Sequence, residues 1–346
     1  MKKILVIFTG GTIGSQIKDA TIDVDAAAGG EILKMFHEKY VRNIEFETMQ
    51  PLNILSENSN PMYWQVLYNA MKNLNFQSYS GIIITHGSDT LPYTGAFIGF
   101  LFHYLEIPIV ITASNYTLGR AKSNGLTNFI NSVELIHESG LKGIYSVFQN
   151  NKNKSKIFLS TRIQEADAYQ DQFISFGGSD LGEIQNGKVL LHRSAVNPTR
   201  KQLNEHRVKL LGDDLYFVNR ITAIKPYPGL VYRDFNFPVK PSAILHSLYH
   251  SGTGCIHGGR YSLPDFVKKC IESGIDFYII SLKNVESDLY ITSREIMEAG
   301  AIPLQNISFE AAYAKLNIAY NQTAMSPMEY MQKEIFFEFL PKMNAK

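Results

Sequence analysis

Short apolar runs alternate with longer helical patterns through the first half of the chain, and this alternation constrains the fold most. Strands are predicted at residues 4–8, 81–85 and 107–112, and helices at residues 31–39, 93–105 and 127–137. This order predicts βαβ units and an α/β fold built on a mostly parallel sheet. The strands are continuous apolar sequences such as ILVIF and IPIVIT, which indicates burial on both faces.

The pattern changes after Phe173, and a second α/β series follows. GEIQNGKVLLHR carries an Asn-Gly turn between two alternating runs and predicts an antiparallel hairpin. Residues 197–216 are polar and weakly periodic, so we expect a linker between an N-terminal domain (1–196) and a smaller C-terminal α/β domain (217–346). Helices of the second domain are predicted near residues 263–273, 293–299 and 326–339.

The charge of the chain argues against large charged partners. Its 33 Lys+Arg and 32 Asp+Glu residues leave a formal net charge of +1, so we expect neither nucleic acid nor a membrane surface as a partner. The first strand begins too early for a signal peptide, and no segment approaches the roughly 20 apolar residues that span a bilayer. Two cysteines without a CxxC pair indicate free thiols. We therefore expect a cytoplasmic protein with a small-molecule ligand.

Two turns rich in glycine and hydroxyl groups directly follow predicted strands. The first is TGGTIG, residues 9–14, and the second is HGSDT, residues 86–90. Ligands of open α/β sheets bind at the carboxyl ends of the strands, so both turns are candidate site segments.

The first turn has two functional interpretations. It matches neither the dinucleotide fingerprint nor the P-loop, although an anion nest of backbone N–H groups stays open. The other interpretation is that the glycines expose the Thr12 hydroxyl as a nucleophile, to be activated by a neighbouring group. In either turn the hydroxyl residues could instead simply cap the following helix.

These blocks resemble the two signature blocks of the bacterial-type L-asparaginases, of the cytoplasmic type I kind. NILSENSNPMYW is similar to the substrate loop of that family, and PYPG and MEAGAIPLQNISFEAAYAKL are similar to its C-terminal part. The resemblance covers essentially the whole chain. It implies a large flavodoxin-like N-terminal domain, a smaller C-terminal α/β domain, no metal or organic cofactor, and a homo-oligomer, a dimer or tetramer, whose sites are shared between neighbouring subunits.

The resemblance also implies residue roles. Thr12 takes the place of the nucleophile that attacks the amide carbon. Ser88 stands where the family has a second threonine, which activates water, and Asp89 takes the place of the acid that binds the substrate ammonium. Gly11 and Gly87 let the backbone approach the substrate.

The substrate loop supplies two further residues. Ser56 and Glu57 fall where the family holds the α-carboxylate and amino group of its substrate. No metal ligand is implied.

The chain also departs from the family pattern. No tyrosine follows the first block, and Thr21 lies nearest its place. The relay lysine is replaced by Gln164 or Glu165, with Lys122 as a conceivable substitute. Neither Gln164 nor Glu165 supplies the positive charge that would lower the proton affinity of a hydroxyl.

Two more positions differ. Asn124 stands where the family tends to have aspartate, and the YHSGTG loop lacks the asparagine that the neighbouring copy often contributes, for which His250 or Ser251 could substitute.

We therefore expect an amidohydrolase that converts asparagine or a related small amide to the acid and ammonia through a threonine nucleophile. The alternatives are an amidase for a modified amino acid and a weakened or inactive amino-acid-binding regulatory homologue. The amidotransferase subunit that uses this fold on charged transfer RNA is disfavoured, because the chain starts directly at the first strand and has no basic excess.

Overall fold

A computed structural model describes residues 2–11, 13, 15–18, 21–24, 28–40, 43–282 and 289–341. The chain forms two compact units, one of residues 1–213 and 335–337 and one of residues 214–334 and 338–346. The division falls within the expected linker, residues 197–216, which holds the short helix α5 (Arg200–Leu203). The domain limits drawn from the sequence stay a prediction.

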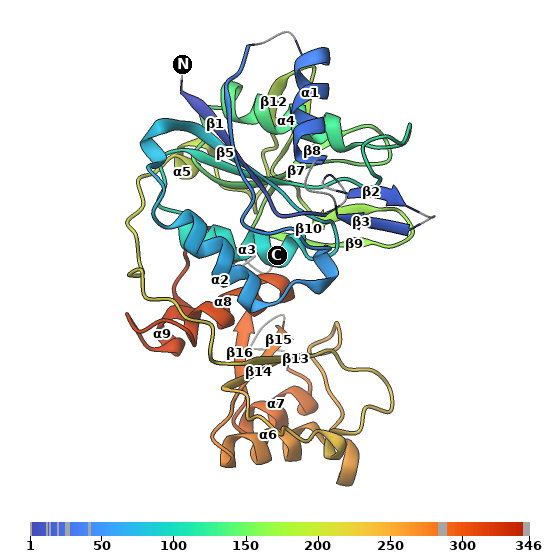
Figure 1. Cartoon of the computed structure of the whole chain (residues 1–346). Helices are drawn as coiled ribbons and strands as arrows, with labels where there is room; N and C mark the ends of the chain where they lie inside the picture. The colour runs from blue at the N-terminus through green and yellow to red at the C-terminus, as the bar shows by residue number, and fades with distance from the viewer. Residues whose placement is uncertain are drawn as a thin grey trace. The chain divides into compact units, whose positions relative to one another are not determined.

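The first unit is built on an eight-stranded sheet (Figure 1). Its strands are β1 (Lys3–Phe8), β4 (Phe46–Met49), β5 (Tyr79–Thr85), β6 (Pro108–Thr112), β7 (Gly143–Gln149), β8 (Ser155–Leu159), β11 (Gly182–Gln185) and β12 (Lys188–Leu191). They lie in the order β12-β11-β8-β7-β6-β5-β1-β4. The strands from β4 to β7 pair in parallel and the others antiparallel. The predicted α/β class is confirmed, because the parallel strands follow the flavodoxin-like order second, first, third, fourth, fifth.

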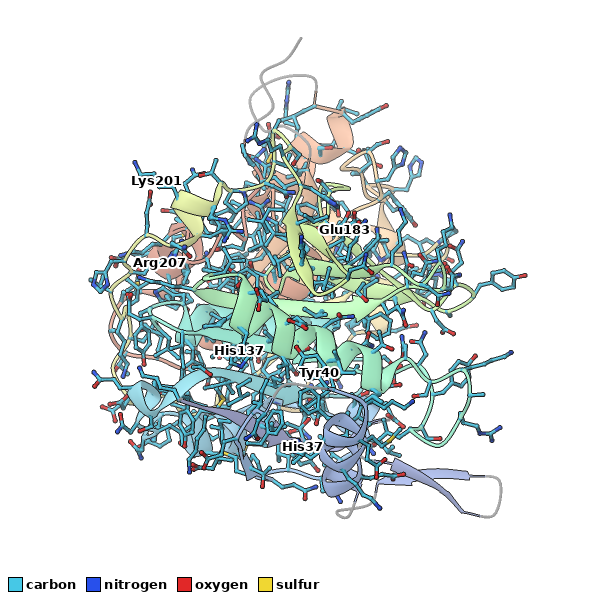
Figure 2. The ribbon with its side chains drawn as sticks, turned by 90° about the horizontal axis from the view of Figure 1, so that it is seen from above. His37, Tyr40, His137, Glu183, Lys201 and Arg207 are labelled. Atoms are coloured by element: carbon cyan, nitrogen blue, oxygen red, sulfur yellow. The ribbon has the colours of Figure 1, made fainter. Side chains whose placement is uncertain are left out.

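Helices cover both faces of this sheet (Figure 1). The helices α1 (Ala28–Lys39) and α4 (Gly125–Glu138) lie on one face, and α2 (Pro61–Met71) and α3 (Leu91–Phe102) on the other. Figure 2 shows His37 and Tyr40 at the end of α1 beside His137 of α4, and Tyr40 donates a hydrogen bond to Glu134 of α4.

The helix α3 is apolar around its whole circumference, as expected of a helix enclosed by its surroundings. Trp64 of α2 stacks on Phe97 of α3 with ring centroids 5.0 Å apart, and every residue of α3 except Tyr93 is buried. The first turn of α3 is therefore firmly seated beside the sheet.

Besides the antiparallel pair β7–β8, the described part of the first unit contains further antiparallel hairpins. The predicted hairpin is confirmed as β11–β12, where Asn186 and Gly187 have φ values of 49° and 74°, as a type I′ turn requires. The others pair β2 (Ser15–Lys18) with β3 (Thr21–Val24), and β9 (Ile163–Asp167) with β10 (Gln172–Ser175).

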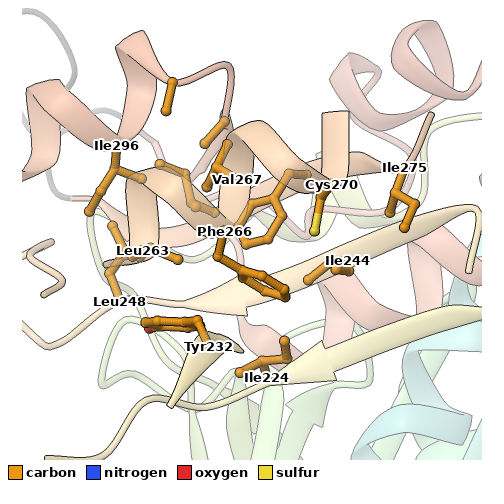
Figure 3. Packing of buried hydrophobic residues seen from close by; sticks show 14 of the residues in the cluster. Ile224, Tyr232, Ile244, Leu248, Leu263, Phe266, Val267, Cys270, Ile275 and Ile296 are labelled. Carbon is orange, nitrogen blue, oxygen red and sulfur yellow. The ribbon is translucent and has the colours of Figure 1, made fainter. Parts of the chain in front are cut away.

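The second unit contains a four-stranded parallel sheet. Its strands β13 (Ile221–Ile224), β14 (Ala243–Ser247), β15 (Asp276–Leu282) and β16 (Ile302–Gln305) are adjacent in chain order. Its helices are α6 (Leu263–Glu272), α7 (Ile291–Glu298), α8 (Phe309–Ala319) and α9 (Pro327–Gln332). Figure 3 shows the apolar core, in which Phe266 and Val267 of α6 lie among Ile244, Tyr232 and Ile296.

The last predicted helix, residues 326–339, is wrong in its extent. Ser326 caps α9, but Lys333 is already extended, so the helix ends at Gln332. Packing of the following residues into the first unit overrides local propensity. The ring of Phe336 fills the space beside Gly143, and the Arg162 guanidinium donates to the carbonyl of Phe337.

No helix among the described residues combines the length and apolar character needed to cross a bilayer. Cys255 is exposed, Cys270 is buried, and both are free thiols.

Candidate functional site

The candidate site lies where the order of the parallel strands reverses. The strand β1 pairs with β4 on one side and with β5 on the other, so the connections that follow β1 and β5 diverge at their carboxyl ends. Such a switch point is where open α/β sheets bind ligands. Both turns singled out in the sequence begin there.

The first turn is anchored to its neighbours by backbone hydrogen bonds. Thr9 donates to the carbonyl of Thr85 through its N–H (3.3 Å) and its hydroxyl (2.8 Å). Gly10 forms a parallel bridge to Ile54, and the Gly11 N–H donates to the Ile54 carbonyl at 3.0 Å. Gly10 and Gly11 have φ values of 99° and 71°, which favour glycine. Thr12 lies outside the described residues.

Hydrogen bonds of the buried His86 fix the second turn, residues 86–90. Burial lowers the pKa of the His86 imidazole, so the ring is neutral at pH 7. Its Nδ1 lies 2.8 Å from the Gly87 carbonyl oxygen, and because that oxygen only accepts, Nδ1 carries the proton. The backbone N–H of His86 also donates to the Thr112 carbonyl at 2.8 Å.

The two turns and the substrate loop approach each other too closely for side chains. A Cβ atom on Gly11 would lie 2.3 Å from the backbone nitrogen of Gly87, and one on Gly87 would lie 2.3 Å from Oγ of Ser56. Segments near residues 11, 56 and 87 therefore converge at one point, and glycine is required at two of them.

The polar side chains at this point are linked. The buried Ser56 hydroxyl donates to Oδ2 of Asp89 at 3.2 Å, and the Thr90 hydroxyl donates to the Ser56 carbonyl at 2.9 Å. Ser88 is half-buried, whereas Asp89 and Glu57 are exposed. An exposed carboxylate held in one orientation can receive a cation, and the adjacent hydroxyl can bind or activate a polar group.

Thr90 is a residue that the sequence analysis missed. It occupies the N-cap of α3, but its hydroxyl bonds to the Ser56 carbonyl instead of capping the helix. The HGSDT motif contains Thr90, and only the long-range contact with residue 56 distinguishes this role from capping.

The residues that depart from the family pattern lie in different surroundings. Gln164 is half-buried on β9, and the neighbouring Glu165 is exposed and accepts a hydrogen bond from the Tyr93 hydroxyl. Lys122 is exposed. The side chain of Thr21 lies outside the described residues.

Asn124 holds two connections of the first unit together. Its Oδ1 accepts from the Asn115 N–H at 2.9 Å, and its Nδ2 donates to the Gln149 carbonyl at 2.9 Å. His250 and Ser251 belong to the second unit, with the serine hydroxyl 3.4 Å from the His250 ring. Within the part of the chain that the structure describes, no cluster of three metal-ligating side chains is present.

Comparison with known proteins gives one matching family model, "Asparaginase, N-terminal", over residues 3–197. Among curated proteins, the chain is 27% identical to a glutamyl-tRNA(Gln) amidotransferase subunit of Methanobrevibacter smithii. That alignment covers all of this chain and 78% of the relative. The corresponding subunit of the Metallosphaera sedula amidotransferase is 28% identical over 99% of this chain and 77% of its own length.

Comparison with solved structures agrees with the family model. The thermostable L-asparaginase from Thermococcus kodakarensis superposes with a TM-score of 0.78 at 25% identity, covering 97% of this chain and 99% of that one. L-asparaginase I from Vibrio cholerae superposes with a TM-score of 0.76 at 22% identity, over 98% of this chain and 99% of that one, and shows likeness of fold alone.

Proposed function

Since this chain belongs to the asparaginase family of amidohydrolases, we propose that it hydrolyses the side-chain amide of asparagine or a related small amide. The products are the acid and ammonia. The observation that carries the proposal is the convergence of the Gly11, Ser56 and Gly87 segments at the switch point, with the Asp89 carboxylate held by Ser56.

The proposed reaction begins at Thr12, which directly follows the Gly10–Gly11 turn. Its hydroxyl oxygen attacks the amide carbon, its proton passes to the departing nitrogen, and ammonia leaves an ester on Thr12. Water then cleaves this ester, which releases the acid and restores the hydroxyl. Ser88 assists by orienting that water.

The other site residues bind the substrate in this proposal. Asp89 receives the α-ammonium, because it is an exposed carboxylate oriented by a hydrogen bond. Ser56 and Glu57 hold the amino-acid end on the same loop. Gly11 and Gly87 leave room for the substrate to approach the backbone.

A second candidate is a subunit of an amidotransferase. The similarity to the glutamyl-tRNA(Gln) amidotransferase subunits spans the whole chain and favours this role. The near-zero net charge favours a small substrate instead, because transfer RNA is a polyanion.

Ammonia release tests the two candidates. The protein and its Thr12→Ala variant are assayed with asparagine, glutamine and succinamate, each with and without glutamyl-tRNA(Gln). Release from a free amide that is lost in Thr12→Ala supports the proposal. Release that requires the charged transfer RNA supports the amidotransferase role, and binding of amides without release indicates an inactive regulatory homologue.

The proposal includes a homo-oligomer, a dimer or tetramer. Light scattering gives the mass in solution, and the specific activity should fall on dilution to monomer if neighbouring subunits complete the site.

A further inference from the structure

Tyr93 connects the start of α3 to another element of the first unit. It is the third residue of α3, four positions after Asp89, and its hydroxyl donates to the Glu165 carboxylate on β9. The helix α3 also packs against β9. This contact has no part in the proposed reaction, yet it joins the helix whose N-cap, Thr90, directly follows the proposed ammonium-binding carboxylate.

The start of α3 and the two residues before it are held by hydrogen bonds to two other segments. With the first segment, the Thr90 hydroxyl donates to the Ser56 carbonyl at 2.9 Å, and the Ser56 hydroxyl donates to Asp89 at 3.2 Å. The hydrogen bond from Tyr93 to Glu165 links α3 to the second segment, β9. Hydrogen bonds to an ionised carboxylate are stronger than those between neutral groups. The rigid phenol ring of Tyr93 also limits the movement of the groups that it joins.

We propose that Tyr93 and Glu165 are positioning residues that orient Asp89 toward the α-ammonium of the ligand. The inference rests on the proposed function, in which Asp89 receives that group. It also accounts for the acid at position 165 on this strand, because a carboxylate accepts a hydrogen bond from the Tyr93 hydroxyl and an ammonium does not. The site would then select amino acids with a free ammonium, and ligands without one would not depend on the Tyr93 contact.

Equilibrium binding of aspartate and succinate tests this inference, because succinate has both carboxylates and lacks only the ammonium. We expect Tyr93→Phe to weaken aspartate binding about tenfold and to change succinate binding less than about twofold. Glu165→Gln keeps an acceptor oxygen and should retain most of the aspartate affinity, whereas Glu165→Ala should match Tyr93→Phe.

Tyr79→Phe is the matched control. Tyr79 also donates to a carboxylate, Oε1 of Glu47 at 2.8 Å, but it lies at the amino end of β5, away from both turns. It should change neither affinity, and the thermal midpoint of each variant checks its fold. Equal loss of aspartate binding in Tyr79→Phe would indicate general loosening and overturn the inference.

Ammonia release from asparagine and succinamate, measured in the same proteins, separates the two proposals. Unchanged aspartate affinity in Tyr93→Phe, or equal weakening of both ligands, overturns the positioning role even when the wild type hydrolyses asparagine. Absence of release in the wild type overturns the proposed function, while selective loss of aspartate binding still supports the positioning role. A wild type that binds neither ligand overturns the positioning role, and one that also releases no ammonia overturns both.

Discussion

Two similar turns, one in each unit, use their backbones differently. The Gly10–Gly11 turn follows β1 and bonds to the Thr85 and Ile54 segments. The backbone of the turn after β14 bonds mainly within the turn, with the Gly252 N–H donating to the Tyr249 carbonyl at 2.7 Å and the Tyr249 N–H donating to the Thr253 carbonyl at 3.0 Å. From outside the turn, the Ser293 hydroxyl on α7 donates to the Gly252 carbonyl at 2.6 Å.

The glycines of the two turns also differ in the space around them. A Cβ on Gly11 would meet a backbone atom at 2.3 Å, whereas a Cβ on Gly252 would meet the tip of the Leu282 side chain at 3.1 Å. Similar glycine-rich sequences therefore predict similar local turns, but the candidate site forms at the turn where the backbones of other segments approach most closely.

The largest expected difference between the turns concerns their hydroxyl groups. Thr12→Ala should lower the rate of ammonia release by about a thousandfold or more, because no other group would form the ester. Thr253→Ala in the turn after β14 should leave the rate unchanged. Steady-state rates with asparagine measure both. A Thr12→Ala protein with normal turnover would contradict the nucleophile assignment.

Alanine at the two glycines tests the difference in packing. Gly11→Ala should lower activity by about a hundredfold and the free energy of unfolding by about 3 kcal/mol, because both the positive φ and the Gly87 backbone oppose a side chain. Gly252→Ala should cost about 1 kcal/mol, mainly for its φ of 76°. Urea denaturation measures both, and equal costs would refute the comparison.

A pH dependence of stability is expected from His246 on β14, the strand before the turn of the second unit. Burial lowers the pKa of His246 to about 4, from about 6.5 in the unfolded chain, and its Nε2 lies 3.0 Å from the Tyr232 hydroxyl. Since the unfolded state takes up the proton first, stability falls as the pH drops below 6.5, by about 3 kcal/mol at pH 4.

His246→Gln removes this proton uptake and keeps an acceptor for Tyr232. Its unfolding free energy should fall less between pH 7 and pH 4 than that of the wild type. Identical pH dependence of the two proteins would show that His246 is not the sensitive group. His86 contributes in the same direction, because burial also lowers its pKa.

The smallest effect expected in this series concerns the hydrogen bond from Ser56 to Asp89 at the candidate site. Ser56→Ala removes the donor to Asp89 and should raise KM for asparagine about tenfold, with kcat less affected. Ser247→Ala, on β14, is the comparison variant and should leave KM unchanged. A lower kcat at constant KM would place Ser56 in the chemical step instead.

Much of the fold follows from local sequence patterns. The apolar runs of β1, β5 and β6 and the Asn186–Gly187 turn depend on near neighbours in the chain, and all are present as predicted. The extent of α9 does not depend on local sequence alone, because the residues after Gln332 pack into the first unit.

Less of the candidate site than of the fold could be predicted from the sequence. The motifs predicted Ser56, Gly87 and Asp89 as site residues, and these three are adjacent in the structure. Their roles in substrate binding and catalysis stay a prediction. The bridge from Gly10 to Ile54 and the bond from Thr90 to Ser56 join segments that are distant in the chain. Only the paired strands determine which segments meet, so no local pattern reveals these contacts.

The return of residues 335–337 to the first unit has a consequence for synthesis on the ribosome. The space beside Gly143 is filled by Phe336, and Arg162 reaches its carbonyl partner at Phe337. These residues follow residues 214–334 of the second unit in the chain. The first unit therefore completes its packing only after residues 214–334 of the second unit have emerged, so a chain that stalls before Phe336 leaves an apolar gap in the domain that was made first.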